Sequence, residues 1–596
     1  MTFEDIFADN SILKSVITGY KPRQGQRELS KFIFECLRDY SDCVIEAPTG
    51  SGKTIAYLLP ALELDRKVIV STKSKQLMNQ LFFKDLEALL SLDKWGKKVS
   101  FFKGRRNYFC TLRYNKLILP YGEEYQDVKI WRDQFDERSI VEVPPYFWGT
   151  EIHDKITADS YQCVGSKCSY IGVCSFYMAK NKAAEADITI TNHHMILTDI
   201  ASRVKGGFGG NFEFCDNVIF DEAHSIIDIY PLYSGDEVSL GSIKNILRDN
   251  RGNISPELYK TILNHIKNFE NSISEKSDMK PSHIQEIYSI FLKTEEVLKN
   301  CADDDDMESF RKISGRLKFV LENEGVRTVE PSGSSLLFRN IPLSAGETFW
   351  EGLKKIGMSS VFISATLTFG GNFDFFNREL GLANKVKEYI VEKSPFEKNA
   401  YLVVPEGIGD DVQNKKSFYF DVLSNFNGPV IMIFNSLRMM NEIYTYLKNS
   451  GIKREIILQR DVNLGEYFAD RNSVILGCSV LREGIDIKTN SKLKCLIMDK
   501  LPFENISDVY LAKRAEDVEK SGGNKFSSFY LPRAVLYFKQ ALGRLIRGEE
   551  DYGLWVVLDD RILKKNYGKA FLDTIREVDI YTDFFEALKL LEEKYG

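Results

Sequence analysis

The sequence has no long apolar run, no basic N-terminal segment and no excess of positive charge. Nowhere does it approach the roughly 20 consecutive apolar residues that span a bilayer. Its first residues, MTFEDIFADN, lack the basic and apolar segments of a secretory signal. We therefore expect no membrane association and a cytoplasmic location. The formal net charge of −6 does not favour nucleic acid as a partner, but it does not exclude one, because only the contact surface has to be basic.

Internal repeats, low-complexity segments and C-x₂-C pairs are also missing, although ten cysteines are present. In a large cytoplasmic chain, these cysteines are not expected to form disulfides. Four thiolates in one place suit either a [4Fe–4S] cluster or a tetrahedral zinc ion, and the lack of C-x₂-C pairs argues weakly against zinc. The four that stand together, with 52, 4 and 5 residues between successive members, are Cys110, Cys163, Cys168 and Cys174.

Length and hydrophobic pattern predict several domains built from alternating strands and helices. A chain of 596 residues is too long for a single core. Short apolar runs alternate with helical stretches in two blocks, as in parallel sheets covered on both faces, so the predicted fold class is α/β with two such domains in tandem. In the first block the predicted strands are Cys43–Glu46, Lys67–Thr72, Ile188–Thr191, Asn217–Phe220 and Val361–Ser364. In the second block they are Pro429–Phe434, Glu455–Leu458, Ser473–Leu476, Leu493–Met498 and Leu554–Leu558.

Two regions interrupt the alternation in the first block. Residues 101–182 contain the four clustered cysteines, and residues 235–342 are charged and helical in pattern. We interpret the acidic run Asp303–Asp306 in the second region as a solvated loop. The predicted boundaries assign to the first α/β domain residues 1–100, 183–234 and 343–384, and to the second domain residues 385–596.

A phosphate-binding loop follows the first predicted strand and opens a helix, which is the context that such a loop requires. Its glycines let backbone N–H groups surround a phosphate, and the helix N-terminus favours an anion. Lys53 is expected to reach the β- and γ-phosphates of ATP, and Thr54 to supply a hydroxyl to Mg²⁺. The loop comprises Ala47, Pro48, Thr49, Gly50, Ser51, Gly52, Lys53 and Thr54.

A second segment carries the carboxylates that a nucleotide site needs. An apolar run ends in Asp221 and Glu222, and Ala223 and His224 follow. Asp221 is expected to hold Mg²⁺, and Glu222 to orient and deprotonate the attacking water. Alone, this segment would be interpreted as an ordinary acidic strand end. Together with the phosphate-binding loop, it indicates ATP hydrolysis.

A third segment supplies arginines. Arg544 and Arg547 lie three residues apart on one face of a predicted helix that also carries Gln540. From such a helix they can reach across a domain interface and stabilise charge on the γ-phosphate. On its own, the pair would be interpreted as part of a surface helix with salt bridges. The other two segments make a catalytic role the better interpretation.

These segments, in this order, resemble those of superfamily 2 helicases. The cysteines narrow the resemblance to the XPD/DinG family of iron–sulfur DNA helicases, closer to the DinG branch. The resemblance extends from Tyr20 to about Lys569. Further similar segments are PRQGQ (22–26), ST (71–72), KGRRNYFC (103–110), TNHH (191–194), SATL (364–367), EGID (483–486), LPF (501–503) and DDR (559–561).

The resemblance implies two tandem RecA-like P-loop domains, with an iron–sulfur insertion and a helical arch-like insertion in the first. It implies ATP and Mg²⁺, and it favours a [4Fe–4S] cluster on the four clustered cysteines. Gln26 would read adenine, and His224 would form a hydrogen bond to the SATL segment. The further ATP-site residues that it implies are Arg23, Gly484 and Asp486.

The partners expected from the same resemblance are single-stranded DNA and forked or tailed duplex DNA. We expect a monomer that moves 5′→3′ in DNA repair or replication, and the polarity is carried from the family alone. Thr72 lies in a segment that touches the DNA backbone in the family. Basic and aromatic side chains suit phosphate contact and base stacking, although a solvated face fits them nearly as well; those concerned are Arg105, Arg106 and Tyr108.

Three alternatives stay open. An RNA helicase of the DEAH-box class shares the DEAH and SAT segments, but it resembles this chain poorly around residue 540 and lacks the cysteine insertion. A clamp or scaffold that uses ATP as a switch would hydrolyse ATP without separating strands. A zinc-bound regulatory ATPase would fit the cysteines if they hold zinc rather than a cluster.

Overall fold

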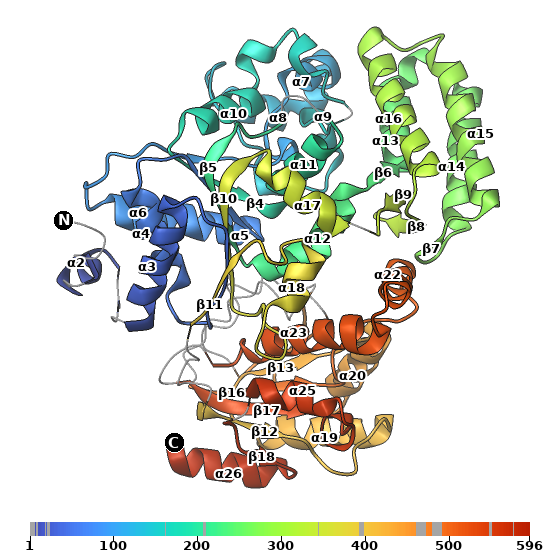
Figure 1. Ribbon diagram of the computed structural model, residues 1–596. Coiled ribbons are helices and arrows are strands. Elements are labelled where there is room, and N and C mark those ends of the chain that lie inside the picture. Colours follow the sequence, from blue (N-terminus) through green and yellow to red (C-terminus); the bar gives the residue numbers. More distant parts are fainter. Residues whose placement is uncertain are drawn as a thin grey trace.

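Two seven-stranded parallel sheets form the framework of the computed structural model, with the first sheet in the upper half and the second in the lower half of Figure 1. This arrangement confirms the predicted α/β class with two domains in tandem. The structure describes residues 6–7, 10–17, 20, 24–160, 162–206, 210–343, 345–391, 398–459, 472–478, 492–546, 551–575 and 577–595.

The first sheet has the strand order β11-β1-β10-β5-β2-β4-β3 and is parallel throughout. Its strands are β1 (Cys43–Glu46), β2 (Val68–Thr72), β3 (Val99–Phe101), β4 (Ile188–Asn192), β5 (Cys215–Asp221), β10 (Gly357–Ser364) and β11 (Lys387–Ile390). All five strands predicted for this domain are present. β3 and β11, which are short and lie at the two edges, were not predicted.

Both faces of the first sheet are covered by apolar side chains. Because successive residues of a strand point to opposite faces, Val44 and Phe362 join one buried cluster, while Ile45 and Val361 join the other. Helices α11, α12 and α17 contribute to the first cluster, and α3 and α4 to the second. The carboxyl ends of parallel strands meet at one edge of a sheet, where ligands bind in such folds.

The second sheet has the order β14-β15-β13-β16-β17-β12-β18 and is also parallel. Its strands are β12 (Ala400–Val403), β13 (Val430–Ile433), β14 (Ile456–Leu458), β15 (Val474–Gly477), β16 (Leu493–Met498), β17 (Tyr552–Val557) and β18 (Ile580–Tyr581). The five strands predicted here are all present, and β12 and β18 are additional.

Helices flank both sheets, and none of the described helices is long and apolar enough to cross a membrane. Those of the first domain are α2 (Asn10–Val16), α3 (Gln24–Arg38), α4 (Lys53–Glu63), α5 (Lys75–Gln80), α6 (Glu87–Leu90), α11 (His193–Val204), α12 (Ile226–Ser234), α17 (Ala345–Lys354) and α18 (Asp374–Glu379). Those of the second are α19 (Val412–Asn425), α20 (Leu437–Asn449), α22 (Val509–Lys520), α23 (Leu531–Leu542), α24 (Arg561–Lys564), α25 (Gly568–Leu572) and α26 (Phe584–Tyr595).

The two insertions lie above the first sheet in Figure 1 and differ in construction. The cysteine-containing insertion has three short helices around a small apolar cluster that includes Phe109 and Trp131: α7 (Thr111–Leu117), α8 (Gln126–Arg132) and α9 (Glu151–Ile156). Its last helix, α10 (Ser175–Glu185), packs on the core of the first domain. The second insertion has longer helices: α13 (Leu240–Asp249), α14 (Pro256–Asn271), α15 (Pro281–Leu298) and α16 (Asp304–Glu322). These helices accompany an antiparallel sheet that was not predicted, in the order β6-β9-β8-β7: β6 (Asp236–Ser239), β7 (Ser277–Asp278), β8 (Val326–Ser332) and β9 (Ser335–Ile341).

The predicted start of the second domain at residue 385 is too early. Strand β11 pairs with β1 in parallel and therefore belongs to the first sheet. Its sequence, KEYI, is mostly exposed at the edge of that sheet. An exposed edge strand carries no apolar run, which is why the hydrophobic pattern did not indicate it.

The acidic run in the second insertion is not a loop, and that prediction is wrong. Asp303 caps α16 by accepting a hydrogen bond from the backbone N–H of Asp306, and the following aspartates form the first turn of that helix. Acidic side chains are favourable there because the N-terminus of a helix carries partial positive charge. Lys116 of the cysteine-containing insertion lies 2.7 Å from both Asp303 and Asp306, so the run also joins the two insertions.

Candidate functional site

The phosphate-binding loop lies between β1 and α4, as predicted. Gly50 and Gly52 both have φ of +80°, a conformation that residues with a Cβ rarely adopt. A Cβ on Gly52 would also lie 2.2 Å from the side chain of Gln26. Glycine is therefore required at position 52 for two independent reasons, and the start of α4 points its free N–H groups into the loop.

Gln26 lies against this loop, where the family resemblance expects it. Its side chain is buried, its Nε2 donates to the carbonyl of Gly52 at 2.9 Å, and its Oε1 accepts from the hydroxyl of Tyr20 at 2.9 Å. The reading of adenine by Gln26 stays a prediction. Arg23, predicted beside it, lies outside the described residues.

The carboxylates of the second segment stand at the end of β5, facing the loop. Glu222 has φ of +56°, an uncommon conformation for a residue with a Cβ. Its Oε1 lies 3.6 Å from Nζ of Lys53. Asp221 accepts a hydrogen bond from the hydroxyl of Tyr57 at 3.2 Å. The chain thus brings one lysine and two carboxylates together from β5 and α4.

The two carboxylates have pKa values that are shifted in opposite directions. Burial, followed by the charge of Glu222, raises the pKa of Asp221 to about 7. Burial acts to raise the pKa of Glu222 too, but the charge of Lys53, the hydrogen bond of His224 and the charge of Arg544 outweigh it and hold the pKa well below its usual value. Near pH 7, Asp221 is therefore about half protonated, whereas Glu222 is ionised.

His224 links this site to β10, which confirms the hydrogen bond expected from the resemblance. Its Nδ1 lies 2.8 Å from Oγ of Ser364, the last residue of β10. The same hydroxyl lies 3.3 Å from Oε2 of Glu222. A change in the segment that follows β10 can therefore reach the catalytic carboxylate through two short contacts.

Helix α23 of the second domain approaches the loop from the opposite side. A Cβ placed on Gly543 would lie 3.4 Å from Oγ1 of Thr49. Helix α23 ends at Leu542 and Arg544 lies in the turn that follows, so the prediction that Arg544 lies on the helix is wrong. The charge of Arg544 still contributes to the low pKa of Glu222, so the guanidinium lies close enough to act on it. Gln540 is buried. Arg547, Gly484 and Asp486, which were predicted for the same site, lie outside the described residues.

The space between these elements is lined by polar atoms that suit a nucleotide. In the part of the chain that the structure describes, the atoms without a hydrogen-bond partner include Oγ of Ser51, Oγ1 of Thr366, Nε2 of His224 and Oε1 of Gln540. Buried polar atoms without partners are costly in a finished core. Ser51 belongs to the loop itself and Thr366 lines the cavity between the domains, so a polar ligand bound there could satisfy them.

The four clustered cysteines converge from separate segments. Burial raises the pKa of Cys110 to about 11, and the neighbouring thiols of Cys174 and Cys163 add to the increase. The pKa of Cys168 is raised by burial and by the same two thiols. All four are free thiols, and Cys163 and Cys174 each act electrostatically on both Cys110 and Cys168. Among the described side chains, no three histidines, cysteines or carboxylates are arranged to ligate a single metal ion.

The residues predicted to contact DNA are mostly engaged elsewhere. Tyr108 is buried, and its hydroxyl accepts from the backbone N–H of Lys103 at 3.0 Å, so the prediction that it stacks on a base is wrong. The side chain of Thr72 is also buried. Arg105 donates to Sγ of Cys163 at 2.8 Å. Arg106 is exposed beside Asp154, and its contact with DNA stays a prediction.

Comparisons with known proteins agree with this geometry. Protein-family models match the chain as a DEAD/DEAH box helicase over residues 27–109, as DEAD_2 over residues 152–239 and as a helicase C-terminal domain over residues 419–578. Solved structures with the same fold include an XPD helicase (15% identity, TM-score 0.59, 94% of this chain and 99% of that chain) and Xpd4 of S. tokodaii (13% identity, TM-score 0.53, 94% of this chain and 100% of that chain).

Curated relatives extend over nearly the whole chain. The "ATP-dependent DNA helicase YoaA" of Haemophilus influenzae is 28% identical, covering 99% of both chains. The protein of the same name in Escherichia coli is 28% identical, covering 98% of this chain and 99% of that protein. The "3'-5' exonuclease DinG" of Bacillus subtilis is 24% identical, covering 94% of this chain and 71% of that protein.

Two RecA-like domains, with a phosphate-binding loop and a DEAH segment in the first and Arg544 supplied by the second, define an ATP-hydrolysing motor of helicase superfamily 2. Within that superfamily, the cysteine-containing and arch-like insertions and the relatives identify a narrower group. The chain belongs to the XPD/DinG family.

Sequence reasoning missed three side chains beside this site. Glu46 is the last residue of β1, Lys539 precedes Gln540 on α23, and Thr368 follows the SATL segment. A charged residue at the end of an otherwise apolar strand, as in CVIE, was the available signal for Glu46. The other two carry no local signal, because their role depends on contacts between the two domains.

Proposed function

We propose that this chain is a DNA helicase that uses Mg²⁺-ATP to move 5′→3′ along single-stranded DNA and to separate duplex strands, in DNA repair or replication. The convergence of Lys53, Glu222 and Arg544 from two RecA-like domains is the observation that carries the proposal. The names of the YoaA relatives support DNA as the substrate. The polarity rests on the family resemblance alone.

ATP binding changes the partners of the catalytic side chains. In the structure, Nζ of Lys53 lies 3.6 Å from Oε1 of Glu222. The β- and γ-phosphates compete for Lys53, and the loss of a neighbouring positive charge raises the basicity of Glu222. Glu222 thus becomes a better base for the attacking water when the substrate is in place. Arg544 supplies positive charge from the second domain.

Asp221 and Thr54 are the residues that would hold Mg²⁺, which neutralises charge on the phosphates when it is bound. The proton that burial keeps on Asp221 would leave as the cation arrives. Hydrolysis and phosphate release weaken the attraction between the two domains. The His224–Ser364 contact would carry that change from Glu222 to the segment after β10.

The four clustered cysteines are proposed to hold a [4Fe–4S] cluster that stabilises the fold of the insertion. Four thiols without disulfides fit a cluster, and the side chain of Arg105 and the backbone N–H of Gly165 both donate to Sγ of Cys163, at 2.8 and 3.4 Å. Such donors stabilise sulfur ligands and tune the cluster. Zinc is the alternative, and iron and zinc analysis of anaerobically purified protein distinguishes the two.

Strand displacement on matched duplexes tests the proposal. The duplexes carry a 5′ or a 3′ single-stranded DNA tail, and the protein is purified without oxygen and supplied with Mg²⁺ and ATP. Displacement only from the 5′ tail is the expected result. Displacement only from the 3′ tail would retain the motor and reject the polarity. ATP hydrolysis without displacement from either tail would favour the clamp that uses ATP as a switch.

An RNA duplex of the same sequence with the same tail provides the matched substrate control. A DNA helicase is expected to be stimulated in ATP hydrolysis by single-stranded DNA more than by the corresponding RNA. Equal or stronger stimulation by RNA would favour the DEAH-box RNA helicase alternative.

A further inference from the structure

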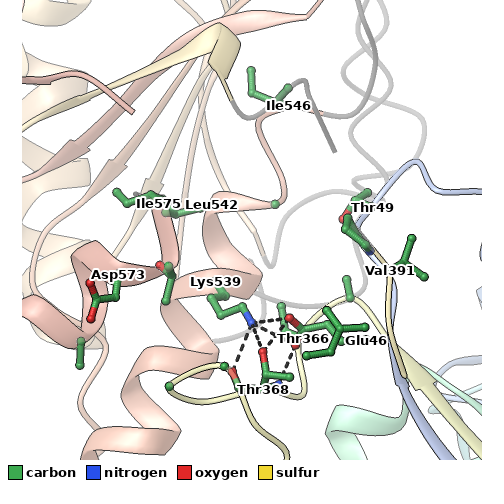
Figure 2. A pocket seen from close by; sticks show the side chains of 18 of the residues that line it. Glu46, Thr49, Thr366, Thr368, Val391, Lys539, Leu542, Ile546, Asp573 and Ile575 are labelled. Carbon is green, nitrogen blue, oxygen red and sulfur yellow. Dashed lines mark hydrogen bonds and ion pairs between the residues drawn. The ribbon is translucent and has the colours of Figure 1, made fainter. Parts of the chain in front are cut away.

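Lys539 lies on α23 directly before Gln540 and points at the first domain (Figure 2). Its Nζ lies 2.8 and 3.0 Å from the two carboxylate oxygens of Glu46. The same Nζ donates to the backbone carbonyl and the hydroxyl of Thr368 at 3.2 and 3.1 Å. The side chains of Lys539 and Glu46 are 17% and 12% exposed. This is a largely desolvated contact, in which charge pairs are stronger than on an open surface.

Glu46 connects this contact to the phosphate-binding loop. It is the last residue of β1, and the phosphate-binding loop begins at the next residue. Its Oε2 accepts from the backbone N–H groups of Leu367 and Thr368 at 2.6 Å each, and its Oε1 accepts from the hydroxyl of Thr368 at 2.7 Å. One carboxylate therefore joins the loop that binds phosphate to the segment that follows Ser364.

The two domains do not pack closely beside this contact. A cavity of about 360 Å³ lies between them, with Thr49 and Val391 of the first domain and Leu542 and Ile546 of the second among its lining residues (Figure 2). Where side chains leave such a space, apolar packing does not fix the distance between domains. At the wall of this cavity, the Lys539 contact provides a directional link across it.

A second polar contact anchors α23 farther along its length. Nη2 of Arg533 lies 2.6 Å from Oδ1 of Asp228, and the hydroxyl of Tyr537 donates to Oδ2 of the same residue at 3.1 Å. Asp228 lies on α12, shortly after the DEAH segment. Arg533 and Lys539 are six residues apart, or about 9 Å along a helix. Two anchors at that spacing fix both the position and the rotation of α23, and hence the place of the turn after it that carries Arg544.

We propose that Lys539 is a positioning residue for ATP hydrolysis, which holds α23 in register with the phosphate-binding loop through Glu46. The inference deepens the proposed function and rests on the ATP-hydrolysing part of it. Lys539 directs its ammonium group to Glu46 and Thr368. It acts by holding Arg544 and Gln540 against the loop and Glu222, and by joining that position to the segment after β10 through Thr368.

The test compares Lys539→Met with Lys539→Arg. In the methionine variant Glu46 keeps its three hydrogen bonds to Leu367 and Thr368, so the first domain stays intact while α23 loses its anchor. The kcat for ATP hydrolysis with single-stranded DNA is expected to fall about 10- to 100-fold, the range associated with a displaced catalytic group. The Kd for a fluorescent ATP analogue is expected to change less than about twofold, because the loop still binds phosphate. The arginine variant, which keeps the charge, is expected to retain most of the rate.

Lys276→Met is the matched control. Lys276 also pairs across the two domains, with Asp508 at 2.8 Å, but that contact is more exposed (30% and 26%) and does not involve the loop. It is expected to leave both kcat and Kd unchanged. A drop in kcat for Lys276→Met equal to that for Lys539→Met would overturn the inference, because the loss of any contact between the domains would then lower the rate.

A double variant shows whether Lys539 acts through Glu46. Glu46→Gln keeps an oxygen for the two backbone N–H groups but removes the charge that faces Lys539. If the two act as one contact, the double variant loses no more rate than the more damaging single variant. Losses that multiply, or a wild-type kcat in Lys539→Met, would reject the proposal. ATP hydrolysis is measured independently of strand displacement. If the protein hydrolyses ATP without separating strands, the helicase proposal is rejected, but the role of Lys539 in hydrolysis can still be tested.

Discussion

The ATP site and the cysteine cluster hold their functional side chains by different means. At the ATP site, Asp221 ends a buried parallel strand and Glu222 follows it, and apolar clusters on both faces of the sheet support that strand. In the insertion, Cys110 directly precedes the short helix α7 beside one small apolar cluster, whereas Cys174 precedes α10, which packs on the core of the first domain. A site built on a sheet has its geometry before a ligand arrives, whereas a site built on short helices depends on its ligand to hold them together.

This difference separates two kinds of sensitivity. Substitutions at the sheet-built site are expected to abolish ATP hydrolysis and leave the fold intact. Substitutions of the cysteines are expected to loosen the insertion locally and leave part of the ATP hydrolysis. The following predictions run from the largest expected effect to the smallest. The first three test whether the two sites differ in this way.

Lys53→Ala is expected to lower the turnover of ATP by about a thousandfold, because the phosphate-binding loop loses the positive charge that reaches the β- and γ-phosphates. The melting temperature is expected to change little. A matched control is Lys67→Ala, which removes a half-exposed lysine that lies directly before β2 and donates to the carbonyl of Ala184. Near-normal hydrolysis by Lys53→Ala would reject the assignment of the phosphate-binding loop.

Glu222→Gln is expected to bind ATP and hydrolyse it about 100-fold more slowly, because the attacking water loses its base. Equilibrium binding of an ATP analogue and single-turnover hydrolysis measure the two effects separately. Loss of ATP binding would show that Glu222 supports the structure of the loop rather than the reaction.

Cys163→Ser is expected to lose the brown colour and strand displacement, while ATP hydrolysis falls less than about tenfold, because Lys53, Asp221 and Glu222 lie at the sheet and not in the insertion. Cys301→Ser is the matched control, since Cys301 is a free thiol of the other insertion that donates to the carbonyl of Val297 at 3.2 Å. Retained iron together with full displacement would remove the cluster from the proposed function.

The last prediction concerns the free energy of unfolding, not ATP hydrolysis, and it involves His193 in acid. His193 is fully buried beneath the site, with Nδ1 2.8 Å from Oγ of Ser71, and burial lowers its pKa to about 3. The unfolded chain takes up a proton below about pH 6.5 while the folded chain does not, so stability is lost as the pH falls. The loss is about 2 kcal/mol at pH 5.

His193→Gln removes this proton-binding group. Denaturant unfolding at pH 7.5 and at pH 5 is expected to show a smaller loss of stability in acid for the variant than for the unaltered chain. An equal loss in both would assign the acid sensitivity to other groups.

The sequence predicts the sheet-built site far better than the insertions. Residue order around Lys53 and Glu222 is itself the signal, because loop, strand end and helix start are neighbours in the chain. The ten predicted strands were found for a related reason, since strands buried on both faces are continuous apolar runs. Edge strands such as β11 and β18 have no such run and were missed.

Contacts between distant segments could not be predicted. The acidic run at Asp303 looks like a solvated loop until Lys116 is brought beside it, 187 residues away in sequence. Tyr108 looks like a stacking residue until the core around Phe176 encloses it. Glu46 and Lys539 meet over 493 residues. In each case the sequence shows what the side chain can do chemically, but it does not show which distant residues will lie beside it.

The strand order of the first domain also constrains how this chain is made. β10 (Gly357–Ser364) lies between β1 and β5, yet ribosomes synthesise it after both insertions. Until then β1 and β5 each present an unpaired apolar edge, the kind of surface on which nascent chains aggregate. The phosphate-binding loop therefore cannot be completed until more than half of the protein has been translated, and a chain that stops in the second insertion would be a substrate for chaperones and proteases rather than a truncated ATPase.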